Sequence, residues 1–347
     1  MPRSSKKQPS KNWAARKWAG YKTWLADYKE RRPHRTFRRT RRRDYVRPIV
    51  LPGHIAFTHT VFQTVWRNWR LFLPLAAIYA VLYGLLVGLS SQATYADLSA
   101  TMQELGAEAF GGDWDAASQV GALFLSVMTS GLGVELTEAQ QLFAAFLTLM
   151  VWLTVVWLLR NKMAGHAVKL RDGLYSAGAP LFASIVVVLI MLVQLIPVAI
   201  AAIGYAAAVS TGMLDGGVEA MLFWIAASLL ALLSLYWISS SLFAMVIITL
   251  PGMYPLKALK SSGDIVFGRR LKLLLRVLWM VLVIAVVWAL VLLPFIGLDM
   301  WLKSLWPAIE WLPVIPILLV LLSALTTIWT STYIYLLYRK VVDYVAK

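Results

Sequence analysis

The sequence contains no cysteine, which excludes a disulfide framework, a thiolate metal site and a cysteine nucleophile. Histidine is scarce too, with four copies at His34, His54, His59 and His166. His54 and His59 are not at the i, i+4 spacing of a helical metal pair. No glycine-rich phosphate loop, paired-carboxylate site or Ser-His-Asp arrangement is evident. We therefore expect a protein that is not an enzyme, with no metal site and no cofactor.

Charge is the next scarcity, because only 14% of the 347 residues are charged, against about 25% in soluble domains. Hydrophobic residues make up 60% of the chain, and the mean hydropathy is +0.68. A single core cannot bury so many apolar residues, because a folded chain of this size still exposes a large share of its surface. The composition indicates an all-α integral membrane protein. The first long apolar run begins near Leu71, too late for a signal peptide, and we expect it to remain as an anchor.

A helix that crosses a bilayer needs about 20 mainly apolar residues. Six segments meet this requirement, and we predict spans at about Leu71–Ser90, Leu142–Leu159, Leu181–Ala208, Met221–Leu250, Leu273–Leu298 and Val314–Leu337. A shorter run, Val120–Leu132, is too short to span and lies in a predicted external loop at 91–141. Residues 51–347 then form the membrane domain, and residues 1–50 form a basic tail.

Basic residues alternate strictly between successive connections of this arrangement. No Lys or Arg occurs between Leu71 and Leu159, but seven acids do. The connections at 160–180 and 251–272 are basic, whereas those at 209–220 and 299–313 hold a single base, Lys303. Because Lys and Arg stay on the cytoplasmic side, we predict a multi-pass protein of the cytoplasmic membrane with both termini inside.

A short segment of similar pattern precedes each outward span, at Val61–Phe72, Leu170–Leu181 and Ser262–Leu273. We interpret these segments as cytoplasmic interfacial amphipathic helices, so that six spans form three pseudo-repeated helical hairpins. The alignment places Gln63, Asp172 and Asp264 together, and it predicts helix caps or local ion pairs at Asp172 and Asp264. Pro197 and Pro294 also recur near the outer ends of two spans and predict kinks or helix ends.

The segment LPGMYPLKALKSSGDIVFGRR, Leu250–Arg270, contains a Pro-Gly turn, an Ala-Leu-x-x-Ser segment and a glycine before two arginines. It resembles bacterial polytopic membrane proteins related to the membrane domain of glycerophosphodiester phosphodiesterases. The resemblance implies a bundle of helical hairpins. It does not imply catalysis, because only about 50 residues of basic tail lie outside the membrane domain and no phosphodiesterase domain is expected.

The last span carries five hydroxyl residues on one helical face: Ser323, Thr326, Thr327, Thr330 and Ser331. Such a face either lines a polar path or allows close helix packing, and we favour packing. Gln194 and Ser239–Ser241 are candidates to face the same interior. Charged residues, which usually mark ion paths, are nearly absent from the spans, and this argues against a proton-coupled pump.

The tail holds a predicted amphipathic helix at about Lys11–Glu30, followed by a basic stretch at Arg31–Arg47 that contains Pro33 and is predicted to be disordered. Its composition suits anionic lipid headgroups, and it also suits RNA or a ribosome, which we rank second; we expect no DNA contact. The candidate binding residues are Arg38, Arg39, Arg41, Arg42 and Arg43 in the tail, with Arg269, Arg270 and Lys272 before the fifth span.

Two classes of function follow from these features. The first is a non-enzymatic membrane protein that contacts anionic lipids or organises a protein partner. The alternative is a transporter or permease component whose path is lined by the hydroxyl face of the last span. A lipid-modifying enzyme ranks third, because the sequence offers no nucleophile with a base.

Overall fold

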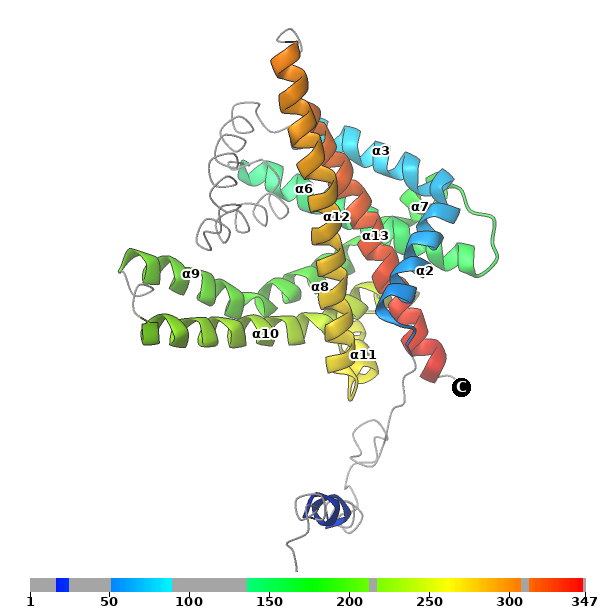
Figure 1. Cartoon of the computed structure of the whole chain (residues 1–347). Helices are drawn as coiled ribbons and strands as arrows, with labels where there is room; N and C mark the ends of the chain where they lie inside the picture. Colours follow the sequence, from blue (N-terminus) through cyan, green and yellow to red (C-terminus); the bar gives the residue numbers. More distant parts are fainter. Residues whose placement is uncertain (1–16, 25–50, 89–135, 212–216, 307–311, 346–347) are drawn as a thin grey trace, which may run out of the picture. The chain divides into compact units, whose positions relative to one another are not determined.

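The computed structural model describes residues 17–24, 51–88, 136–211, 217–306 and 312–345 (Figure 1). Within these ranges every regular element is a helix and there is no β-strand, which confirms the all-α prediction. The chain divides into two compact units. One comprises residues 1–49 and Phe267–Arg269, and its described part includes a helix at 17–24. The other comprises residues 50–266 and 270–347.

The second unit contains all the longer helices that the structure describes. They are α2 (His54–Arg67), α3 (Trp69–Leu86), α6 (Glu138–Met163), α7 (Leu170–Ala177), α8 (Leu181–Gln194), α9 (Ile196–Ser210), α10 (Gly217–Ile247), α11 (Pro255–Val266), α12 (Arg270–Leu305) and α13 (Val314–Val345). The predicted external loop lies largely outside the described residues, and so do Val120–Leu132 and most of the basic tail.

Five of the helices are long and apolar enough to cross a membrane: α3, α6, α10, α12 and α13. Each overlaps one predicted span. A bent pair, α7 and α8, supplies a sixth candidate if the two helices count as one span, and the angle between them is 66°. The described helices therefore confirm the architecture of a multi-pass membrane protein at the level of five or six apolar spans.

The third predicted span, Leu181–Ala208, is interrupted, and this confirms the predicted kink or helix end at Pro197. The structure divides it into α8 and α9, which meet at Leu195. Pro197 lies at the second position of α9, where its missing N–H leaves the carbonyl one turn earlier without its helical donor. Proline at the start of a helix is favourable, so Pro197 suits the beginning of α9 better than the middle of a span.

Pro294 behaves differently from Pro197, although both follow an apolar run. Pro294 lies inside α12, which continues to Leu305. Of the two predicted outcomes at Pro294, a kink or a helix end, the helix end is absent, and α12 is longer than the predicted fifth span.

Local signals explain the ends of two other helices. Thr137 and Gln140 form a reciprocal capping box that starts α6. After the C-terminal end of α10, the chain turns at Pro251 and Gly252. The φ of Gly252 is +72°, in the left-handed region that favours glycine. The Pro-Gly pair of the sequence motif is thus a helix-terminating turn.

Three short helices, α2, α7 and α11, each pack against the end of a long helix, and we call them the elbow helices. Helix α7 packs against α6, α11 against α10, and α2 against α13 (Figure 1). Burial is concentrated near them: the buried residues of α10 lie between Ser234 and Ile247, and those of α6 between Leu147 and Leu159. We call the end of the long helices at which the elbow helices lie the elbow end, and in α6 and α10 it is the better packed end.

The long helices also contact one another in a regular order. Helices α3, α8 and α12 pack against α6, α10 and α13, respectively, which follow them in the chain. Helices α8 and α12 also pack against the long helices that precede them, α6 and α10, and α3 packs against α13, the last helix of the chain. Helix α13 further contacts both α6 and α10. The last helix thus closes the arrangement against the first.

Candidate functional site

A cluster of polar and aromatic groups joins α2 to α12 and α13. Its centre is Arg276, which is only 5% exposed although it lies in the first turns of an apolar helix. The Arg276 guanidinium donates to the backbone carbonyl of Gly53 at 3.2 Å and to that of Pro52. It also lies over the Phe57 ring, 5.6 Å from the ring centroid. Among the described residues, no carboxylate pairs with Arg276.

Further contacts hold the same three helices together. The Tyr333 hydroxyl of α13 donates to the Arg276 carbonyl at 3.1 Å, and the Tyr333 ring meets Phe57 edge to face at 4.8 Å. Trp279 Nε1 donates to Thr58 Oγ1 at 3.0 Å. Burying a polar group is unfavourable unless the group is hydrogen-bonded, and in this cluster each of these buried donors has an acceptor. We therefore assign Arg276 a structural role, as the residue that positions α2.

Two polar residues, Arg160 and Ser241, join neighbouring helices by hydrogen bonds. Arg160, in the last turn of α6, donates to the Thr249 carbonyl just beyond α10 at 2.6 Å. Arg160 therefore connects the end of α6 to the turn that follows α10. Ser241 of α10 donates to Gln194 Oε1 of α8 at 2.8 Å, so two of the polar residues that we expected to face the interior contact each other.

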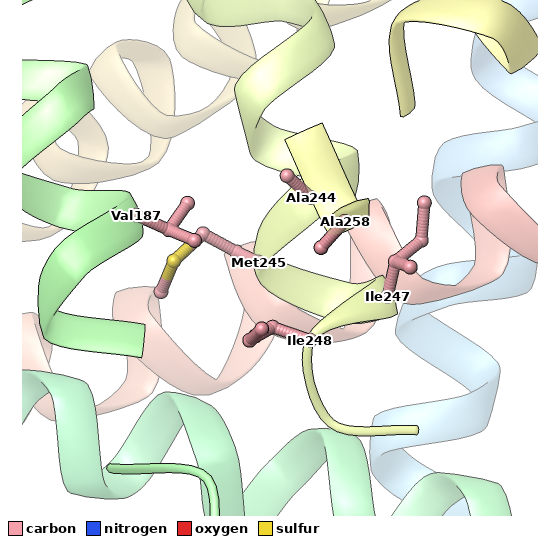
Figure 2. Close-up of a cluster of buried hydrophobic side chains, with 6 residues drawn as sticks. All are labelled: Val187, Ala244, Met245, Ile247, Ile248 and Ala258. Carbon is pink, nitrogen blue, oxygen red and sulfur yellow. The ribbon is translucent and has the colours of Figure 1, made fainter. Parts of the chain in front are cut away.

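Apolar side chains fill the interior of the elbow end. Figure 2 shows its buried cluster, formed by Val187, Ala244, Met245, Ile247, Ile248 and Ala258. These residues come from α8, α10 and α11, and from the residue directly after α10. Leu149 and Trp152 of α6 and Tyr338 of α13 pack against the same cluster. The elbow end is therefore an apolar core to which four long helices contribute.

The hydroxyl face of α13 bonds mainly to its own helix. The hydroxyls of Ser323, Thr327 and Ser331 donate to backbone carbonyls three or four residues earlier, at 2.8, 2.9 and 2.6 Å. Thr326 accepts a hydrogen bond from Trp288 Nε1 of α12 at 2.8 Å. Thr330 is half-buried. Four of the five hydroxyls thus have protein partners, as expected of a packing surface.

The basic residues chosen before the fifth span do not form one exposed group. Arg269 is buried, and the Arg270 guanidinium lies over the Tyr236 ring, 4.6 Å from its centroid. Only Lys272 is exposed, which departs from the expectation of three bases available to a headgroup. The tail candidates Arg38, Arg39, Arg41, Arg42 and Arg43 lie outside the described residues.

Other exposed bases flank the elbow helices, and we had not selected them as binding candidates. They are Arg67 at the end of α2, Arg70 at the start of α3, Lys162 at the end of α6, Lys169 and Arg171 at the start of α7, and Lys257 and Lys260 on α11. The sequence shows that these connections are basic. It does not show which of their side chains are exposed, because a basic residue at a helix end can instead donate to a backbone carbonyl, as Arg160 does.

Asp172 and Asp264 do not occupy equivalent places in their helices. Asp172 is in the first turn of α7, whose N-cap residue, Lys169, makes no side-chain capping bond. Asp172 lies 3.8 Å from the exposed Arg171, so the predicted local pair is present but weakly held. Asp264 lies in the last turn of α11, where a carboxylate cannot cap the start of the helix.

One buried ion pair was missed in the sequence. Lys303 Nζ lies 2.8 Å from Asp299 Oδ2, one turn apart on α12, and Asp299 is buried. The i, i+4 spacing of an acid and a base in an apolar stretch was the available signal. The single base in the fifth connection is Lys303, and the Asp299 carboxylate on the same helix balances its positive charge.

The described residues contain no group of three His, Cys, Asp or Glu placed to hold a metal ion. The search for similar proteins found no matching family model, no matching curated protein and no matching solved structure. The geometry above is therefore the basis for assigning a function.

Proposed function

We propose that this chain is a non-enzymatic multi-pass protein of the cytoplasmic membrane that binds anionic lipid headgroups at its elbow end. In this proposal both termini and all three elbow helices are cytoplasmic. The supporting observation is that the exposed bases of α2, α7, α11 and the start of α12 lie at the better packed end of the helices. Bases on the cytoplasmic side meet a leaflet whose surface potential is negative.

The order of helix contacts supports three related hairpins. Each elbow helix and each first span packs against the second span of the preceding hairpin, and α2 and α3 pack against α13 of the last. In a closed ring of three similar units every unit makes the same contact with the one before it. A pseudo-threefold axis along the membrane normal would give this pattern, and it agrees with the proposed resemblance to the membrane domain of glycerophosphodiester phosphodiesterases.

A transporter path along the hydroxyl face of α13 is the alternative that we rank second. Ser323, Thr327 and Ser331 donate to their own helix, so they offer few free donors to a polar substrate. The elbow end is filled by an apolar cluster to which α6, α10 and α13 contribute. These contacts favour a packed interior, and hence the lipid-binding role.

The lipid-binding role is tested with the variant Lys257→Gln/Lys260→Gln/Lys272→Gln, because all three side chains are exposed. Native mass spectrometry of protein released from nanodiscs of equal phosphatidylglycerol and phosphatidylcholine content measures which lipid stays bound. We expect the variant to lose retained phosphatidylglycerol, whereas the matched Lys→Arg triple variant keeps it. Equal phosphatidylglycerol retention by the Gln and wild-type proteins would contradict headgroup binding at these bases.

A further inference from the structure

The helix at residues 17–24 carries its aromatic side chains on one face. Trp18, Tyr21 and Trp24 follow one another at a spacing of three residues, which keeps them on one side of the helix. Their rings touch in sequence: Trp18 meets Tyr21 edge to face at 6.3 Å, and Tyr21 stacks on Trp24 at 5.9 Å. The face is therefore a continuous row of three rings.

More than half of each of these large side chains is exposed. Trp18 is 64% exposed, Tyr21 54% and Trp24 57%. Trp and Tyr combine an apolar ring with a polar N–H or O–H, which is why they collect at membrane–water interfaces. The Lys22 ammonium lies 6.0 Å from the Trp18 ring centroid, so a positive charge borders the aromatic row. A helix with aromatic residues on one face and Lys beside it is typical of interfacial helices.

We propose that residues 17–24 form an interfacial helix that inserts Trp18, Tyr21 and Trp24 into the headgroup region of an anionic bilayer. The proposal deepens the lipid-binding function above, on whose cytoplasmic placement of the tail it rests, by naming a second binding surface. The occupant is an anionic leaflet because residues 1–50 hold 17 Lys and Arg but only three acids. Charge of this sign attracts anionic lipid and is screened by salt.

The short connection to the membrane domain favours the bilayer over RNA as the partner. Twenty-nine residues separate Trp24 from His54, where α2 begins. A chain of that length reaches at most about 100 Å, at about 3.5 Å per residue. The helix is thus always close to the membrane that holds the spans, which raises the effective concentration of lipid but not of RNA.

The opposite face of the helix provides a matched control. Successive residues of a helix are 100° apart, so Ala19 and Thr23 point away from the side that carries Tyr21. Thr23 donates to the Ala19 and Gly20 carbonyls at 3.2 and 3.0 Å. Because the chain has no cysteine, Tyr21→Cys and Thr23→Cys each create a single site for a nitroxide label in the full-length protein.

The test measures the accessibility of each label by electron paramagnetic resonance in two kinds of nanodisc. In equal phosphatidylglycerol and phosphatidylcholine we expect the label at 21 to be shielded from a water-soluble nickel chelate and open to oxygen, and the label at 23 to show the reverse. The difference should disappear in pure phosphatidylcholine at high salt, and with Trp18→Ala/Trp24→Ala.

Equal accessibility at positions 21 and 23 in the anionic nanodiscs would overturn the proposal. Shielding at 21 that appears only after addition of single-stranded RNA would also overturn it, in favour of a nucleic-acid surface. The labelled variants keep the Lys257, Lys260 and Lys272 side chains, so these measurements do not test headgroup binding by the elbow bases. Failure of the interfacial helix is thus distinguishable from failure of headgroup binding at the elbow end.

Discussion

Arg276 illustrates how a single charged residue can be structural in an apolar helix. Its guanidinium is taken from water, and its described partners are two backbone carbonyls and an aromatic face. An isolated buried charge is very unfavourable, so the hydrogen bonds to Pro52 and Gly53 matter more here than they would at a surface. Arg276 connects the start of α2 to α12, and this places the first elbow helix.

Replacing Arg276 by Met should lower stability, because the two carbonyls lose a charged donor. Hydrogen bonds to charged groups contribute about 1.5–3 kcal/mol, so a decrease of about 2 kcal/mol is expected. Thermal unfolding in a mild detergent, followed by circular dichroism, measures it. Arg276→Lys keeps the charge but not the forked geometry of the guanidinium, so its stability should lie between those of the wild type and Arg276→Met. Wild-type stability in Arg276→Met would show that these bonds do not hold α2.

Gly173 lies where the elbow helix α7 packs closely against α6. A Cβ at this position would lie 2.9 Å from both Cγ and Cδ2 of Leu158 on α6. Gly173→Ala should therefore destabilise the protein by about 1–3 kcal/mol, the usual cost of overpacking. Gly263→Ala on α11 is the matched control, since nothing lies within 4 Å of its Cβ, and it should be neutral or stabilising. The same detergent unfolding assay compares the two, and equal effects would contradict the proposed close packing.

At the scale of the element, the position of a helix was more predictable than its continuity. Apolar length located α6, α10, α12 and α13, because a long uncharged run has no other stable environment than lipid. The same signal treated α8 and α9 as one span, since both are apolar and only Leu195 separates them. Pro197 and Pro294 follow similar sequences, so the sequence alone did not predict which proline would end a helix.

The α8–α9 break supports a prediction about backbone protection. Pro197→Ala restores a donor one turn after Val193, so the helical hydrogen bonds can continue through Leu195. We expect slower hydrogen–deuterium exchange at residues 195–199, measured by mass spectrometry in detergent. Pro294→Ala is the control, because α12 is already continuous there and its neighbouring amides should change less. Faster exchange in Pro197→Ala would show that packing, and not proline, maintains the break.

At the scale of the whole molecule, neither the helix contacts nor the availability of the bases could be predicted from the sequence. The chain order does not say that α2 packs against α13, because that contact joins the two ends of the membrane domain. The sequence shows which connections are basic, but not which of their basic side chains are exposed. It could not predict that Arg269 is buried, or that Arg270 lies over the ring of Tyr236, a residue 34 positions earlier in the chain.

The proposed orientation places the two ends of α10 on opposite sides of the membrane. Val218 is exposed at its start, and Lys260 is exposed on α11, just beyond its other end. The absence of cysteine makes Val218→Cys and Lys260→Cys single-site variants, with the wild-type chain as an unreactive control. A membrane-impermeant maleimide applied to intact bacterial cells should label Val218→Cys, and it should label Lys260→Cys only after permeabilisation. The reverse pattern would invert the topology, and labelling of both sites in intact cells would show that α10 does not cross the membrane.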